Sequence, residues 1–94
     1  MTPAIDRANA APKMVAPLPN GEAVYQVRLS AVPSPPWRAA FYRPPLRLSH
    51  PPHTPDQVEL HVTAVIFRTH PCGLDKWLRW IDRWVAYANS VVEE

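Results

Sequence analysis

The sequence has little glycine, one cysteine and no long hydrophobic run. Only 2 of its 94 residues are glycine, and Cys72 has no second cysteine with which to form an internal disulfide. Apolar stretches such as Ala64–Phe67 are far too short for a membrane helix, and residues 1–20 lack the apolar core of a secretory signal. These absences exclude a disulfide-stapled secreted fold and predict a cytoplasmic protein that makes no membrane contact.

Proline is abundant instead, with 13 residues, and 4 tryptophans stand out in a chain that is 47% hydrophobic. A chain of this length buries only about 60–65% of the surface that it exposes when unfolded. Its apolar residues must therefore be packed efficiently or shared with a partner. The net charge of +2 and the pI of 9.0 are mildly basic and fall short of a dedicated nucleic-acid-binding composition.

The first segment has the composition of a tail and leads into a strand. Residues 1–20 are rich in proline and alanine and show no apolar periodicity, which predicts a disordered tail ahead of a single domain over residues 21–94. Tyr25, Val27 and Leu29 then alternate with neighbours that include Gln26 and Arg28, the period of a half-buried strand.

Residues 34–43 fit either a second hairpin arm or a short helix, and three features favour the helix. Ser34 followed by Pro35 is a typical helix start, two alanines follow, and Trp37 and Phe41 are one turn apart. Residues 44–55 hold five prolines and are expected to form a polyproline-like loop. Whether 46–48 adds an edge strand stays open.

Two further elements complete the predicted fold. Alternation over residues 58–66 predicts a second strand, and an amphipathic pattern predicts a helix from about Leu74 to Val92. The expected order is strand, short helix, proline loop, strand and long helix. This is an α+β fold in which a small two- or three-stranded sheet carries both helices on one face.

The C-terminal helix has an apolar arc of about 180°, much wider than the roughly 100° stripe of an ordinary surface helix. Its aliphatic stripe consists of Leu74, Leu78, Ile81, Val85, Ala88 and Val92. Its aromatic stripe consists of Trp77, Trp80, Trp84, Tyr87 and Val91. One stripe is enough to cover so small a sheet. The other is covered either by the same chain, through Trp37, Phe41 and the proline loop, or by a partner.

The aromatic stripe predicts a protein–protein interface, because Trp, Tyr and Arg concentrate binding energy at such surfaces. The first interpretation is a non-catalytic interaction module or small accessory subunit. It forms a homodimer or higher homo-oligomer, or docks on a larger subunit, through this stripe and an open sheet edge. The predicted partner-binding residues are Trp77, Trp80, Trp84, Tyr87 and Val91, with Arg79 and Arg83 at the rim.

The alternative is a weak single-stranded nucleic-acid-binding protein. The segment between Ala23 and Pro55 contains arginines and aromatic rings but no acidic residue. Cations for phosphates and rings for base stacking are what such a surface needs. The residues assigned to it are Arg28, Arg38, Arg43, Arg47 and Tyr42.

Catalytic and metal-binding chemistry finds little support in the sequence. Cys72 has His70 nearby, but no third group completes a nucleophilic site. His50, His53 and His61 do not match the usual spacing of zinc ligands. We therefore predict that the protein is not an enzyme and has no catalytic residue, no metal site and no cofactor.

Overall fold

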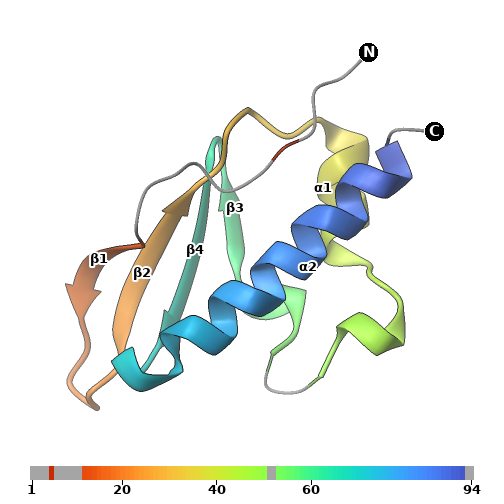
Figure 1. Cartoon of the computed structure of the whole chain (residues 1–94). Coiled ribbons are helices and arrows are strands. Elements are labelled where there is room, and N and C mark those ends of the chain that lie inside the picture. The colour runs from red at the N-terminus through yellow and green to blue at the C-terminus, as the bar shows by residue number, and fades with distance from the viewer. Residues whose placement is uncertain (1–4, 6–11, 51–52, 93–94) are drawn as a thin grey trace.

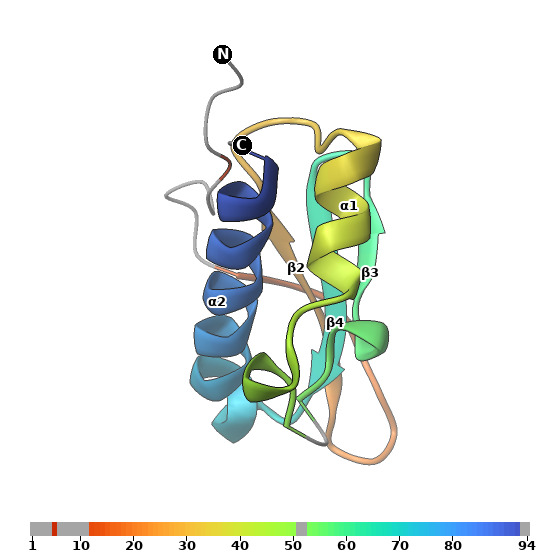
Figure 2. The ribbon, with the colours of Figure 1, turned by 90° about the vertical axis from the view of Figure 1, so that its right-hand side faces the viewer.

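The computed structural model describes residues 5, 12–50 and 53–92. Within them, four strands form one antiparallel sheet in the order β1-β2-β4-β3. The long helix α2 crosses one face of this sheet, and the short helix α1 lies beside α2 next to β3 (Figures 1 and 2). The α+β class predicted from the sequence is confirmed, with more strands than expected.

A hairpin joins β1 (Lys13–Pro17) to β2 (Ala23–Arg28). Its turn is closed by two bonds, Leu18 N–H to the Glu22 carbonyl at 2.8 Å and Gly21 N–H to the Leu18 carbonyl at 3.3 Å. Gly21 has φ of 88°, which closes such a loop with a glycine bulge. Strand β1 lies within residues 1–20, for which the sequence predicts a tail; residues 1–4 and 6–11 of that range lie outside the described residues.

The second strand expected from the sequence is in fact two. β3 (Glu59–His61) and β4 (Ala64–Thr69) pair as a hairpin in which His61 lies opposite Ala64. The two turn residues between them shift the alternation, so Leu60 and Val65 face the core. In one continuous strand over residues 58–66, the alternation would place Val62 and Ile66 on the same face as Leu60, but Val62 is exposed and Ile66 is half-buried. Because the chain turns at residues 62 and 63, β3 provides hydrogen-bond partners for one edge of β4.

Helix α1 (Pro35–Tyr42) begins as the sequence predicts. The Ser34 hydroxyl accepts the Trp37 N–H at 3.4 Å, and prolines occupy the first helical positions, where an N–H would have no partner. The proline loop that follows contains two short 3₁₀ helices, η1 (Leu46–Leu48) and η2 (Pro55–Gln57). The segment 46–48 is therefore a 3₁₀ turn and not an edge strand.

Helix α2 (Leu74–Val92) has the bounds that its periodicity predicts and follows the 3₁₀ turn η3 (Pro71–Gly73). Its inner face and α1 pack on the sheet around one core. The largest fully buried side chains of that core are Trp84, Phe41, Ile81, Val27 and Val65. Both stripes of the helix thus contribute to the core, and its outer margin is what remains for other contacts.

Candidate interaction surface

The structure divides the aromatic stripe of α2 into a buried part and an exposed part. Trp84 is fully buried, its indole N–H donates to the Leu48 carbonyl at 2.6 Å, and its ring meets Phe41 edge to face at 5.9 Å. Trp77 is 8% exposed and packs against Phe67 and His53. The prediction that Trp77 and Trp84 bind a partner is therefore corrected, because the proline loop, α1 and the sheet of the same chain cover both rings.

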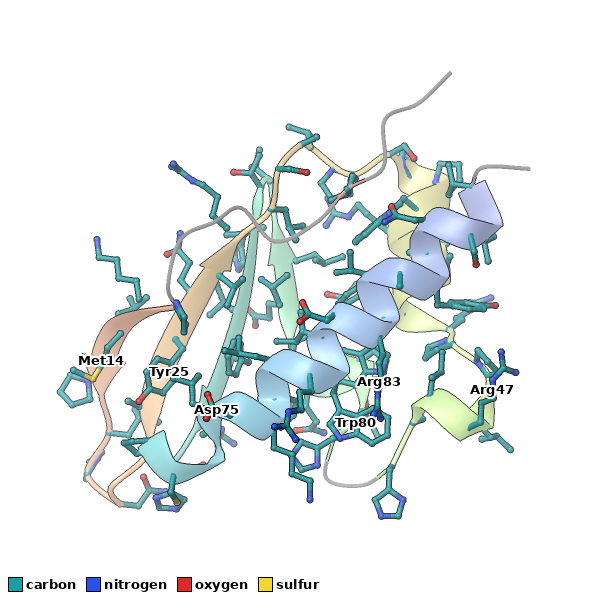
Figure 3. All side chains as sticks on the ribbon, in the orientation of Figure 1. Met14, Tyr25, Arg47, Asp75, Trp80 and Arg83 are labelled. Carbon is teal, nitrogen blue, oxygen red and sulfur yellow. The ribbon has the colours of Figure 1, made fainter. Side chains whose placement is uncertain are left out.

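Trp80 is half-buried, and its indole is in contact with two side chains, those of His53 and Arg83. The His53 ring lies 6.2 Å from the Trp80 ring at an interplanar angle of 12°. The Arg83 guanidinium carbon lies 5.0 Å from the centroid of the same indole, within the range of a cation–π contact. Figure 3 shows Arg83 beside Trp80 on the outer side of α2. The indole and the guanidinium are thus held together before any partner arrives.

Helical geometry extends this site along α2. Tyr87 and Val91 follow Trp80 by about two and three turns, so they lie on the same line of the helix. Tyr87 is half-buried and Val91 is 44% exposed. An adjacent line carries three exposed cations. We call this set the exposed margin; its members are Lys76, Arg79, Trp80, Arg83, Tyr87 and Val91.

The exposed margin carries positive charge without an acidic residue among its members. At about 100° per residue, Asp75 and Asp82 project on the far side of the polar arc from Trp80. The margin therefore presents a half-buried indole, a phenol ring and three cations. It lacks the carboxylates that a second copy of the same surface would need for pairing.

His53 supports Trp80 from within the proline loop. The His53 N–H donates to the His50 carbonyl at 2.6 Å, and the His50 N–H donates to the His53 carbonyl at 3.1 Å, so the two residues form an isolated antiparallel bridge. His53 is only 8% exposed, and its Nδ1 has no hydrogen-bond partner among the described residues. Burial, followed by the charges of Lys76 and His50, lowers the pKa of His53 below its ordinary value. Burial therefore favours the neutral form of the ring at the base of the margin.

The predicted open sheet edge is not at β3, because α1 closes that side. The Tyr42 hydroxyl accepts the Leu60 N–H at 2.9 Å and donates to the Val58 carbonyl at 3.2 Å. Arg38 Nη2 donates to the Leu60 carbonyl at 3.2 Å. Because the N–H and C=O of Leu60 both bond to side chains of α1, they are groups of β3 that point away from β4. Two side chains of α1 thus satisfy the groups that another strand would bind.

The free edge belongs to β1, and it carries features that discourage strand addition. The strand is short, its register shifts between Met14 and Ala16, and Pro17 has no N–H to offer. Lys13 adds a charge at its start. Met14 and Val15 are exposed there. An edge of this kind is a weak template for an additional strand, so the exposed margin of α2 is the better candidate surface.

The arginine segment of the alternative interpretation does not form one surface. Arg38 and Tyr42 are engaged at the edge of β3. Arg28 ends β2, Arg43 follows α1, and Arg47 lies on η1 (Figure 3). These cations are exposed but come from separate elements, and the ring assigned to them is already hydrogen-bonded to the sheet.

Two hollows of the described structure are lined by both polar and apolar side chains. Cavities of about 390 and 370 Å³ share Gln57 and Arg68 in their walls. Their rims mix carboxylates with a guanidinium, and exposed Cys72 lines neither of them. Over residues 5, 12–50 and 53–92, no cluster of three or more His, Cys, Asp or Glu side chains could hold a metal ion.

Comparisons with known proteins place no further constraint on this surface. The sequence matches no protein-family model, and no curated protein and no solved structure is significantly similar to it. Neither helix in the described part of the chain combines the length and the apolar character needed to cross a bilayer.

Proposed function

We propose that this protein is a non-catalytic interaction module that binds an acidic segment of another protein through the exposed margin of α2. The observation that carries the proposal is the arrangement at Trp80. Of the four tryptophans, Trp37, Trp77 and Trp84 are buried in the core, whereas Trp80 remains accessible with Arg83 held against its ring. Tryptophan and arginine are the residues that most often dominate the energy of protein interfaces.

Preorganisation supports this role. Trp80 sits on a 19-residue helix and is braced by His53, so little conformational freedom is lost when it binds. Rigid anchors of this kind raise affinity mainly by lowering the entropic cost of association. The expected energetic centre of the interface is thus Trp80, with Arg83 and Tyr87 beside it.

The charge of the margin favours a different protein over a second copy. A twofold contact between two such margins would offer Lys76, Arg79 and Arg83 no carboxylate from the margin of the other copy, and an interface that gathers like charges without counter-charges is costly. An acidic partner would pair with the same cations and would associate faster at low ionic strength. The homo-oligomer expected from the sequence is therefore replaced, in this proposal, by a hetero-complex.

A peptide-display selection tests the proposal with a defined probe. A random peptide library is selected on the purified protein, and the enriched peptides are then measured by fluorescence anisotropy. We expect peptides in which Asp or Glu flank an apolar residue. Trp80→Ala should weaken their binding by about thirtyfold, the effect of losing roughly 2 kcal/mol at a hot spot. Arg83→Gln should weaken it less, with a flatter salt dependence.

The matched control is Arg28→Gln, which removes an exposed arginine from the end of β2 and should leave binding unchanged. Sedimentation at several concentrations should show a monomer. Equal binding by Trp80→Ala and the unaltered protein would contradict the proposal. So would a dimer that Trp80→Ala dissociates, or an oligonucleotide that outcompetes every selected peptide.

A further inference from the structure

The smaller of the two hollows lies where β4 leads through η3 into α2 (Figure 1). β3 has three residues and β4 has six, and their pairing within the described part of the chain reaches only as far as Ile66. Residues 67–69 therefore extend beyond β3, and the proline loop passes them at a distance that leaves about 370 Å³. This volume is at the lower end of the range for small-molecule sites. The facing walls contain Arg68 and Thr69 of β4, and His53 and Gln57 of the loop.

The polar side chains of this hollow are not engaged with one another. Those of Gln57, Arg68 and His70 form no hydrogen bond or ion pair within the described part of the chain. His53 is more informative, because it is only 8% exposed and its buried Nδ1 has no partner among the described residues. An unsatisfied buried nitrogen is costly, and one in the wall of a cavity points to an occupant that satisfies it.

The charges around the hollow favour a carboxylate. Arg68 is a permanent cation, and its guanidinium presents paired N–H donors that match the two oxygens of a carboxylate. Glu22 is the acidic residue of the walls, and its carboxylate already accepts from Asn20 Nδ2 at 2.6 Å. A phosphate dianion would call for further cations or for the N–H groups of a helix N-terminus. A small monoanion therefore fits these walls better.

His53 supplies the second polar contact. Burial lowers its pKa and favours the neutral imidazole, which offers one N–H and one acceptor nitrogen. A hydroxyl group can bind either nitrogen, because it both donates and accepts hydrogen bonds. The imidazole ring packs at 4.7 Å from Trp77 and 6.2 Å from Trp80, measured between ring centroids. Its nitrogens are therefore held in place before a ligand arrives.

We propose that this hollow binds a small hydroxycarboxylic acid, whose carboxylate pairs with Arg68 and whose hydroxyl group hydrogen-bonds to the His53 imidazole. Trp77 provides an apolar wall for the carbon chain of the ligand. The members of the exposed margin are not among the described residues that line this hollow, so the site does not rest on the proposed function. Failure of one proposal leaves the other standing.

The test uses the full ¹⁵N-labelled chain and three probes: 2-hydroxybutyrate, 3-hydroxybutyrate and butyrate. The probes share one chain length and one carboxylate and differ only in the hydroxyl group. We expect at least one hydroxy acid at millimolar concentration to shift the Arg68 Nε–H and His53 ring signals. That acid should bind about fivefold more tightly than butyrate, the effect of one hydrogen bond.

Two substitutions separate the contacts. Arg68→Gln should weaken the binding of all three acids by about tenfold, the effect of losing a charged partner. The matched control is Arg28→Gln, which removes an exposed arginine from the other end of the paired strands β2 and β4 and should change nothing. His53→Phe keeps the ring but removes its nitrogens, so it should abolish the preference for the hydroxy acid over butyrate. A purely structural role of His53 would instead weaken all three acids alike.

The unaltered protein decides the outcome if His53→Phe does not fold. The proposal is overturned if no acid shifts the Arg68 and His53 signals at millimolar concentration, because water alone then fills the hollow. It is also overturned if butyrate binds as tightly as both hydroxy acids. Displacement of every acid by an equal concentration of inorganic phosphate would overturn it as well, since the site would then select phosphate.

Discussion

A single phenol oxygen closes one side of the sheet. The Tyr42 hydroxyl serves both the Leu60 N–H and the Val58 carbonyl, so its loss leaves two strand groups without their partner. We expect Tyr42→Phe to lower the free energy of unfolding by about 1–3 kcal/mol, the usual cost of leaving such groups unsatisfied. Urea denaturation measures that change.

Amide hydrogen exchange locates the effect of Tyr42→Phe. Exchange at Leu60 should accelerate, because its N–H then faces solvent. The control is Tyr87→Phe on the exposed margin, which should leave Leu60 exchange unchanged. If Tyr42→Phe leaves it unchanged as well, the Tyr42 hydroxyl does not protect the Leu60 N–H from solvent.

His53 makes stability depend on pH in a direction that its surroundings determine. Its pKa in the folded state is lowered by burial, and further by Lys76 and His50. The unfolded state, with a pKa of about 6.5, therefore takes up the proton first as pH falls. The stabilisation is fully present above about pH 6.5 and is lost as pH falls toward the lowered pKa.

Melting curves between pH 8 and pH 4.5 check this dependence. His53→Phe keeps a ring against Trp77 and Trp80 but removes the titrating group, so it should flatten the fall in melting temperature below about pH 6.5. His70→Gln, at an exposed histidine, should not. A fall that is equally steep in both variants would show that other groups govern it.

At the scale of elements, α2 contains positions of very different energetic weight. Ile81 is fully buried against the sheet, whereas Trp80 is only half-buried at the margin. We expect Ile81→Ala to cost about 2–5 kcal/mol of stability, as large-to-small changes in a core do. Trp80→Ala should cost clearly less and act mainly on partner binding. Unfolding of Trp80→Ala at room temperature would show that this ring is structural.

The elements that the sequence predicts well are those with local signals. Ser34 and the prolines after it mark the start of α1, and the apolar period of α2 gives both of its ends. Strand β1 is harder to predict because its side chains are mostly exposed and show no alternation. The turn Pro19-Asn20-Gly21 is a signal that predicts this hairpin. The turn at Val62 and Thr63 offers no such signal, because neither residue is typical of tight turns.

The candidate site could be predicted only in part, and the reason is also physical. Helical periodicity places Trp77, Trp80 and Trp84 in one arc and cannot tell them apart. Which ring stays exposed depends on where the proline loop returns: Leu48 covers Trp84, and His53 packs against the other two. The contact between Ile5 and Asn89 could not be predicted for the same reason, because these residues are 84 positions apart in the sequence.

At the scale of the whole molecule, the described structure leaves little surface for indiscriminate contact. One edge of the sheet is satisfied by α1, and the other is short and interrupted by proline. The core uses three of the four tryptophans. On α2, what remains exposed is a cationic margin with one indole.

The strand order β1-β2-β4-β3 has a consequence for how the chain reaches this state. The outer pairs are local hairpins, which form within about 1–10 μs. The central pair, β2 with β4, closes only after α1, the proline loop and β3 have been gathered between them. Until β2 and β4 pair, the complete sheet is absent, so α2 has no sheet face to pack against. The rate-limiting event is therefore the pairing of strands that are distant in the sequence. Folding should be slow for the chain's length, because the entropy of closing the long loop is lost before the contacts between these strands stabilise the chain.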